Sequence, residues 1–233
     1  MEALNSPVQL DEWMSTLKEM NTSSTSGPSG ISYSIIKHLP DIAHNTIINF
    51  INLSVQIGIV PSQWRLSTIC PIPKPEGFNY DLNNIRPIAL LDNIRKCATK
   101  LLNNRLSNIL KQHNILRGLN FYGLKGEDTT VPLKKAYDSM PLASLRKALE
   151  RIDISNNVID WIVDLFDKIL IRVITDFGLM DYAHAGDGID QGDALSPLLW
   201  WIFYDPLLVA LDSNSHRGYE LQIKWPTDIS RQH

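Results

Sequence analysis

The most informative stretch of the sequence is Gly186-Asp-Gly-Ile-Asp-Gln-Gly-Asp-Ala-Leu-Ser-Pro-Leu-Leu-Trp200. Its pattern predicts a turn followed by a helix. Its glycines permit backbone conformations that a side chain would block. Ser196 can cap the start of a helix whose first position is Pro197, where the missing N–H costs nothing. The apolar run from Leu198 to Leu211 then predicts a core helix. An ordinary surface loop entering such a helix fits the same pattern.

Length and composition describe a globular chain. Of its 233 residues, 44% are hydrophobic and 20% are charged, which is typical of a folded protein and not of a disordered one. No apolar run is long enough to span a membrane, and no basic segment precedes an apolar one at the N-terminus. We therefore expect an intracellular protein, cytoplasmic or nuclear, with no signal peptide and no membrane partner. Cys70 and Cys97 lack disulfide or zinc-site spacing and are expected to be small buried hydrophobes.

The net charge of −3 is unevenly distributed. Residues 62–117, here called the basic sector, hold nine lysines and arginines against three acidic residues, and the remainder of the chain is acidic. A polyanion-facing surface would produce this distribution, and so would a solvated basic helix. Both interpretations stay open at this point.

Local patterns predict a mixed set of helices and strands. Helices are expected at 1–20, 33–39, 42–57, 92–113, 142–151, 158–170 and 198–211, and strands at 66–72, 85–91 and 172–177, with 182–184 as a hairpin partner and 219–225 as a further candidate. Gly58 should end the helix at 42–57, and Asn156 should cap the helix at 158–170. Prolines near residue 72 should place the first strand at a sheet edge or end it. Segment 119–135 reads as a loop. Without βαβ regularity, the fold class is α+β.

Four separated blocks carry a resemblance to a known family. They are Ser26-Gly-Pro-Ser-Gly-Ile31, then Pro71-Ile-Pro-Lys74 with Asn84-Ile-Arg-Pro-Ile-Ala-Leu90, then Lys134-Lys-Ala-Tyr-Asp-Ser-Met140, and finally Gln191-Gly192. In this order they resemble the reverse transcriptases of non-LTR (LINE-type) retrotransposons. The resemblance implies fingers and a partial palm of a right-hand polymerase without a thumb. It suggests a helical extension at 1–21, a fingers-like region at 22–117 and an incomplete palm-like region at 118–233.

The resemblance also implies a nucleotide pocket. Lys74 and Arg86 match two finger cations that hold the triphosphate of the incoming deoxynucleotide, a role suited to groups that neutralise phosphate charge. Tyr137 matches an aromatic residue that excludes a ribose 2′-hydroxyl. Gln191 and Gly192 match the pair that contacts the nucleotide and permits close approach of the backbone.

Other positions of these motifs are expected to be structural, and one position lacks the family's metal ligand. Asp138, Ser196 and Pro197 support the family's motifs. Polymerases of this kind use two divalent cations, Mg²⁺ in the family, held by carboxylates. The family's first metal-binding Asp lies five positions before the aromatic, where this chain has Pro132, whose side chain has no ligand atom. Asp138 is no replacement.

The remaining metal carboxylates are missing as well. The family's Asp-Asp hairpin has no counterpart after Leu211, and the segments at 123–130 and 134–140 are fused near 131–133, as an internal deletion would leave them. We expect no intact catalytic residue and no productively bound metal. The prediction is a retroelement reverse transcriptase domain that is inactive as it stands, from a family that uses deoxynucleotides and an RNA or DNA template–primer. Alternatives are a non-catalytic nucleic-acid-binding remnant and a decayed gene product.

Overall fold

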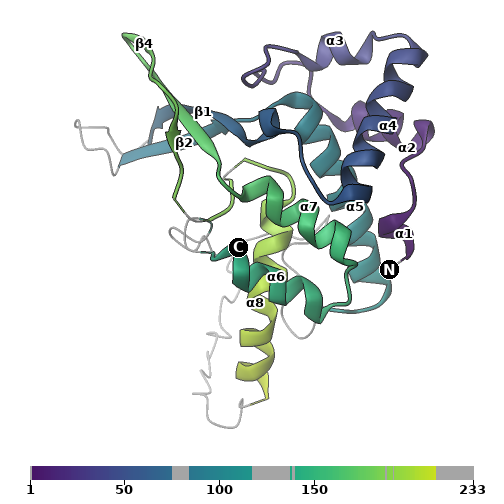
Figure 1. The fold of residues 1–233 in the computed structure, drawn as a ribbon. Coiled ribbons are helices and arrows are strands. Elements are labelled where there is room, and N and C mark those ends of the chain that lie inside the picture. The colour runs from purple at the N-terminus through teal and green to yellow at the C-terminus, as the bar shows by residue number, and fades with distance from the viewer. Residues whose placement is uncertain are drawn as a thin grey trace, which may run out of the picture.

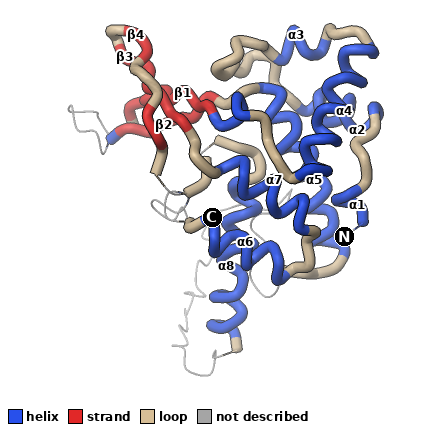
Figure 2. Tube along the Cα trace, in the orientation of Figure 1, coloured by secondary structure: helices blue, strands red, loops and turns tan. Residues whose placement is uncertain are grey.

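The computed structural model describes residues 2–74, 84–116, 137, 140–186, 188–190 and 192–213, with the side chains of residues 2, 3 and 212 excepted (Figure 1). The described chain is mixed helix and sheet, as the α+β prediction requires. Helices make up the body, and the strands gather at one side of it (Figure 2). The predicted loop at 119–135, the candidate strand at 219–225 and the inferred deletion near 131–133 lie outside the described residues.

The N-terminal part is helical. Its helices are α1 (Glu2–Asn5), α2 (Leu10–Glu19), α3 (Tyr33–Lys37) and α4 (Asp41–Ile57). The single helix predicted at 1–20 is wrong, because the chain leaves helical conformation between α1 and α2 at Pro7, which has no N–H to donate. Gly58 ends α4 in the left-handed conformation, with φ of 72°, as predicted.

One sheet follows a short 3₁₀ turn at Ser62–Arg65. Its strands are β1 (Leu66–Pro73), β2 (Ile85–Leu90), β3 (Leu170–Thr175), β4 (Gly178–Leu179) and β5 (Ala183–His184). The order is β2-β1-β3-β4, with β5 also paired to β3. The β1–β3 pair is parallel and the other pairs are antiparallel.

The prolines are predicted to place the first strand at an edge or to end it. The edge position is wrong, since β1 lies between β2 and β3, but the strand does end at Pro73. The prolines are nevertheless compatible with this place. Strand β3 pairs only with Leu66–Ile69, whereas Pro71 and Pro73 lie beyond that stretch and pair with β2 alone. A residue without an N–H therefore removes no hydrogen bond from the doubly paired part of the strand.

The larger helices are α5 (Asn93–Gln112), α6 (Leu142–Arg151), α7 (Asn156–Phe166) and α8 (Ser196–Asp212). Helix α7 begins at Asn156, with Ser155 as its N-cap, so the predicted cap at Asn156 is off by one residue. It also ends four residues earlier than predicted, because Leu170 already pairs with β1. Within the described residues, no helix is long and apolar enough to cross a membrane.

Buried aromatic side chains connect the helices. The Trp13 indole N–H donates to His44 Nδ1 at 2.9 Å and ties α2 to α4. The Trp161 indole N–H donates to Ser54 Oγ at 2.9 Å and ties α7 to α4. Cys97 is fully buried, as predicted, but Cys70 is only partly buried, because its strand lies on the projecting sheet.

We expect Gly58→Ala to lower the free energy of unfolding by about 1–3 kcal/mol. The substituted residue would keep a left-handed backbone, and its Cβ would lie 2.9 Å from Asp160 Cβ. Urea unfolding measures the change. Gly186→Ala is the matched control, because a Cβ there has nothing within 4 Å. Equal stabilities of the two variants would contradict the prediction.

Candidate functional site

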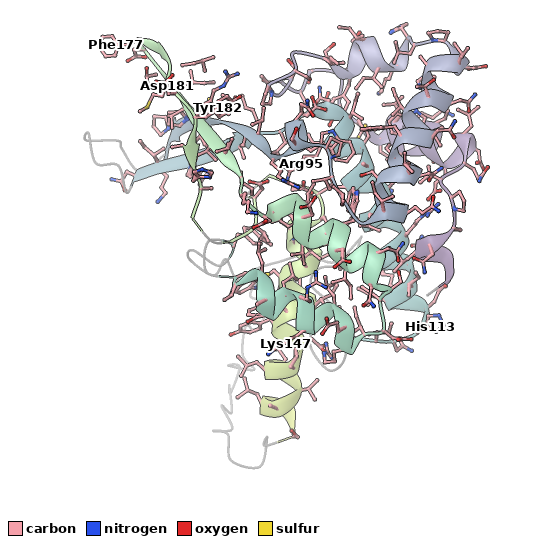
Figure 3. All side chains as sticks on the ribbon, viewed as in Figure 1. Arg95, His113, Lys147, Phe177, Asp181 and Tyr182 are labelled. Carbon is pink, nitrogen blue, oxygen red and sulfur yellow. The ribbon has the colours of Figure 1, made fainter. Side chains whose placement is uncertain are left out.

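A buried arginine connects the turn before α8, described at residues 188–190 and 192–195, to the start of α5. The Arg95 side chain is fully buried, in the interior between the sheet and the helices (Figure 3). Its guanidinium donates to Asp190 Oδ2 at 2.5 Å and lies 3.3 Å from Asp193 Oδ2. It also donates to the carbonyl oxygen of Trp64, just before β1, at 2.5 Å. One cation thus joins three segments that are far apart in the sequence.

The turn itself is fixed by glycine geometry and by local hydrogen bonds. Gly188 and Gly192 have φ of 122° and 120°, values that favour glycine. A Cβ on Gly192 would lie 3.4 Å from the carbonyl oxygen of Ala89, so the turn lies against β2. The predicted capping role of Ser196 is wrong: it is the first residue of α8, and its hydroxyl donates to the Asp190 carbonyl at 2.7 Å. Pro197 does occupy the first turn of α8.

Tyr137 lies against the same turn. The backbone N–H of Ile189 donates to its carbonyl at 3.0 Å, and its ring meets Trp200 edge to face at 6.3 Å. The side chain is partly buried, and this burial raises the pKa of the phenol. The third and fourth sequence blocks therefore meet in space. Gln191, Asp138 and Pro132 lie outside the described residues.

The first block also reaches this place. A Cβ on Gly27 would lie 2.3 Å from the carbonyl oxygen of Leu91, so only glycine permits this contact with the end of β2. The Asn93 side-chain amide donates to the carbonyl of Ile31 at 2.8 Å. Tyr33 is buried beside α5, and burial raises the pKa of its phenol. Residues of the first, second and fourth blocks thus meet at the junction of β2 with α5, and Tyr137 of the third block contacts the same turn.

Lys74 and Arg86 lie farther out on the β1–β2 hairpin. The Lys74 N–H donates to the carbonyl of Asn84 at 2.8 Å, and Arg86 pairs with Ile72 in the sheet. This register places the two cations on one face as diagonal neighbours. Arg86 is exposed and lies three residues along β2 from Ala89, which is about 10 Å of strand. The two cations are therefore neighbours on the hairpin. They lie some distance along β2 from Ala89, the residue that Gly192 contacts.

Comparison with known proteins gives two relatives. The chain is 23% identical over 223 residues to the "Probable RNA-directed DNA polymerase from transposon BS" of Drosophila melanogaster, covering 84% of this chain. It is 24% identical over 191 residues to the "Retrovirus-related Pol polyprotein from type-1 retrotransposable element R2" of Popillia japonica, covering 73% of this chain.

The chain is related to the RNA-directed DNA polymerases of non-LTR retrotransposons. No family model matches it. It spans about a quarter of the length of these two relatives, 24% and 27% respectively.

Four cations of the basic sector are paired with carboxylates of the described chain. Besides Arg95, Arg65 pairs with Asp164 at 2.5 Å, Lys100 with Glu19 at 3.4 Å and Arg105 with Glu12 at 2.6 Å. Both earlier interpretations of the sector need correction for these residues, because their charges meet carboxylates of the same chain. Arg86, on the β1–β2 hairpin, is exposed.

A second cationic contact lies on the Lys74–Arg86 face of the sheet. Arg172 pairs with Thr68, and its Nε donates to the Thr68 hydroxyl at 3.1 Å. The guanidinium also lies 5.0 Å from the centre of the Tyr182 ring, as a cation–π contact. Tyr182 is on the hairpin whose tip is Phe177 (Figure 3). The sequence prediction missed Arg172, because only the strand register places it beside β1.

The described side chains do not fit a polymerase metal site. Within residues 2–74, 84–116, 137, 140–186, 188–190 and 192–213, no group of three His, Cys, Asp or Glu side chains could hold a metal ion. The carboxylates nearest the turn, Asp190 and Asp193, already bind Arg95. A donor set committed to a guanidinium does not suit Mg²⁺, which needs free carboxylate oxygens.

We expect Arg95→Met to cost about 3–5 kcal/mol of unfolding free energy, because it leaves two buried carboxylates without their cation. Arg95→Lys should cost less, since it keeps the charge but not the forked geometry. Arg146→Met is the control: its ion pair with Asp160 is largely exposed, and its loss should cost about 1 kcal/mol or less. Urea unfolding measures all three. A cost for Arg95→Met no larger than for Arg146→Met would contradict the central role of Arg95.

A pH dependence follows from Asp190. Burial raises the pKa of its carboxyl above the ordinary 3.8, and Arg95 opposes this rise without cancelling it. The folded protein therefore holds this proton more tightly than the unfolded chain does. The free energy of unfolding should fall as the pH rises from about 4 through the raised pKa.

Asp190→Asn should remove this part of the pH profile, because an amide does not titrate. Urea unfolding at a series of pH values compares the variant with the unaltered chain. Asp176→Asn, at an exposed carboxyl of the β3–β4 hairpin, is the control. If Asp190→Asn and Asp176→Asn give the same pH slope, the assignment to Asp190 is wrong.

Proposed function

We propose that this chain is a reverse-transcriptase-derived retroelement protein that keeps a nucleotide-binding pocket but does not polymerise DNA as it stands. The observation that supports the pocket is that residues of the first, second and fourth blocks meet at the junction of β2 with α5, while Tyr137 of the third block contacts the same turn. Gly27 and Gly192 lie close to the backbone of Leu91 and Ala89. The carbonyls of Tyr137 and Ile31 accept hydrogen bonds from Ile189 and Asn93. Sequence blocks that matched the family by chance would not be expected to lie close together in the fold.

In this proposal each residue has a defined role. Gly192, with Gln191, lets the backbone approach the nucleotide, and Tyr137 restricts the sugar to a deoxyribose. Lys74 and Arg86, as neighbours on one face of the hairpin, hold the triphosphate. The region 22–117 would act as fingers and the region 118–233 as part of a palm. The extension at 1–21 packs on the fingers-like region through Trp13.

The proposed lack of catalysis rests on the side chains available for Mg²⁺. The position that supplies the first metal carboxylate in the family is Pro132, which has no side-chain ligand atom. The carboxylates of the described turn are bound to Arg95. Nucleotide binding and catalysis are therefore separable in this chain.

A primer-extension assay tests the proposal. The purified chain, given an RNA template, a DNA primer, deoxynucleotides and Mg²⁺ or Mn²⁺, should produce no extended primer, because the two-metal mechanism lacks its carboxylates. An active reverse transcriptase in the same buffer is the positive control. Template-dependent extension by the chain would contradict the proposal.

A non-catalytic nucleic-acid-binding role is the second candidate, and the sheet supports it. Lys74, Arg86 and Arg172 share one face with the partly exposed Tyr182 ring. Cations that contact phosphates, combined with an aromatic ring that stacks on bases, are typical of single-strand binding surfaces. Binding there does not require a metal.

Arg86→Ala should weaken binding of a single-stranded oligonucleotide several-fold and reduce the slope of log affinity against log salt by about 1, as the loss of one phosphate contact predicts. Fluorescence anisotropy at several salt concentrations measures both quantities. Lys18→Ala is the matched control, because Lys18 is an exposed cation on α2. Equal salt slopes for the two variants would exclude a phosphate contact at Arg86.

A further inference from the structure

A cavity of about 310 Å³ opens between α1, α4, α5 and α7. It is on the side of the body that bears α1, away from the strands (Figure 1). Its walls include the buried apolar side chains of Leu4, Ile51, Ala98, Leu101 and Trp161. Of the described residues that line it, none belongs to the four sequence blocks. Close packing normally leaves few voids larger than a water molecule, so this cavity needs an explanation.

One wall of the cavity is the chain segment between α1 and α2, and hydrogen bonds hold it in place. The Asn52 side chain on α4 accepts from the Val8 N–H at 2.7 Å and donates to the Val8 carbonyl at 3.2 Å. The Arg105 guanidinium on α5 donates to the Ser6 carbonyl at 2.5 Å. The segment cannot move inward to fill the cavity without breaking these bonds. The cavity is therefore preformed, which lowers the cost of binding a ligand.

The polar side chains of the inner walls already have partners inside the fold. Arg105 binds both carboxylate oxygens of Glu12, at 2.7 and 2.6 Å, so its charge is neutralised. The Asn157 side-chain amide donates to the Val55 carbonyl at 3.3 Å, and the Trp161 indole N–H donates to α4. Three further polar residues of the lining are exposed: Asn5, Ser6 and Gln56.

We propose that this cavity binds a neutral, apolar small molecule of about the size of two fused rings. Its volume is about twice the roughly 150 Å³ that holds one benzene ring in an apolar protein cavity, and it is at the lower end of the range for ligand sites. An anion would have to compete with Glu12 for Arg105, and a charge without a partner is costly to bury. The inference does not depend on the proposed polymerase ancestry or on nucleotide binding.

A fluorescence titration of the full chain with Prodan, a neutral naphthalene dye that emits more strongly in apolar surroundings, tests the proposal. The dye should bind saturably, and it should raise the Tm in a concentration-dependent way, because it binds the folded chain. Methyl naphthoate, a neutral ester, should displace the dye. Naphthoate, the carboxylate with the same two rings, should displace it at least about tenfold less well, because its charge has no free partner in the cavity.

Two variants that fill the cavity locate the site. Ala98→Phe adds a ring from α5 and Val55→Phe adds one from α4, and each should weaken dye binding at least about tenfold. Because the two changes act from different walls, either one suffices if the other fails to fold. Ala143→Phe is the matched control, since it adds the same ring at an exposed position of α6 outside the cavity. Thermal melts show which variants remain folded.

The outcomes separate the site from its chemistry. Absence of saturable dye binding would overturn the proposal, and so would binding that the folded cavity-filling variants leave as tight as Ala143→Phe does. Equal displacement of the dye by the ester and by the carboxylate would overturn the assignment of a neutral ligand.

Discussion

The structure depends on one buried cation. Arg95 has no access to water, so its charge is tolerable only because two carboxylates and a carbonyl oxygen surround it. The two carboxylates stand on either side of Gly192, and this arrangement fixes the turn against β2. Because the same guanidinium binds the Trp64 carbonyl, the start of β1 is held relative to the turn as well. The position of the sheet and the position of the turn are therefore set by a single side chain.

This constraint explains why a distant relative of retrotransposon polymerases still gathers its sequence blocks in one place. At 23% and 24% identity, most side chains differ from those of the two relatives. The contacts that bring the blocks together are mainly made by backbone atoms, small residues and the Arg95 network, which tolerate change elsewhere. Metal binding is not kept in the same way. A divalent cation needs carboxylates with free oxygens, and the carboxylates of the described turn neutralise Arg95.

Local features of the fold could be predicted, and long-range ones could not. The helix at Leu142–Arg151 has the predicted bounds, and Gly58 ends α4 as expected, because periodicity and capping act within a few residues. The central place of β1 depends on pairing with β3, about a hundred residues later, which no local pattern records. The sequence prediction grouped Arg95 with the other cations of the basic sector, because it considered the charge of the residue and not its place on the buried side of α5. Its spacing of three from Ala98 and seven from Leu102 was the signal that it lies on the buried side of α5.

The Arg95 contacts also restrict how this sequence can drift. A substitution of Arg95 alone leaves two carboxylates in the interior without a cation, whereas a substitution of Asp190 or Asp193 alone still leaves one carboxylate beside the guanidinium. The three positions therefore differ in how freely they can change: either carboxylate can be lost singly at the cost of one contact, but Arg95 can be lost without penalty only after both carboxylates. The order of substitutions is thus restricted, although α5 and the turn that carry these residues are separated by almost a hundred positions in the sequence.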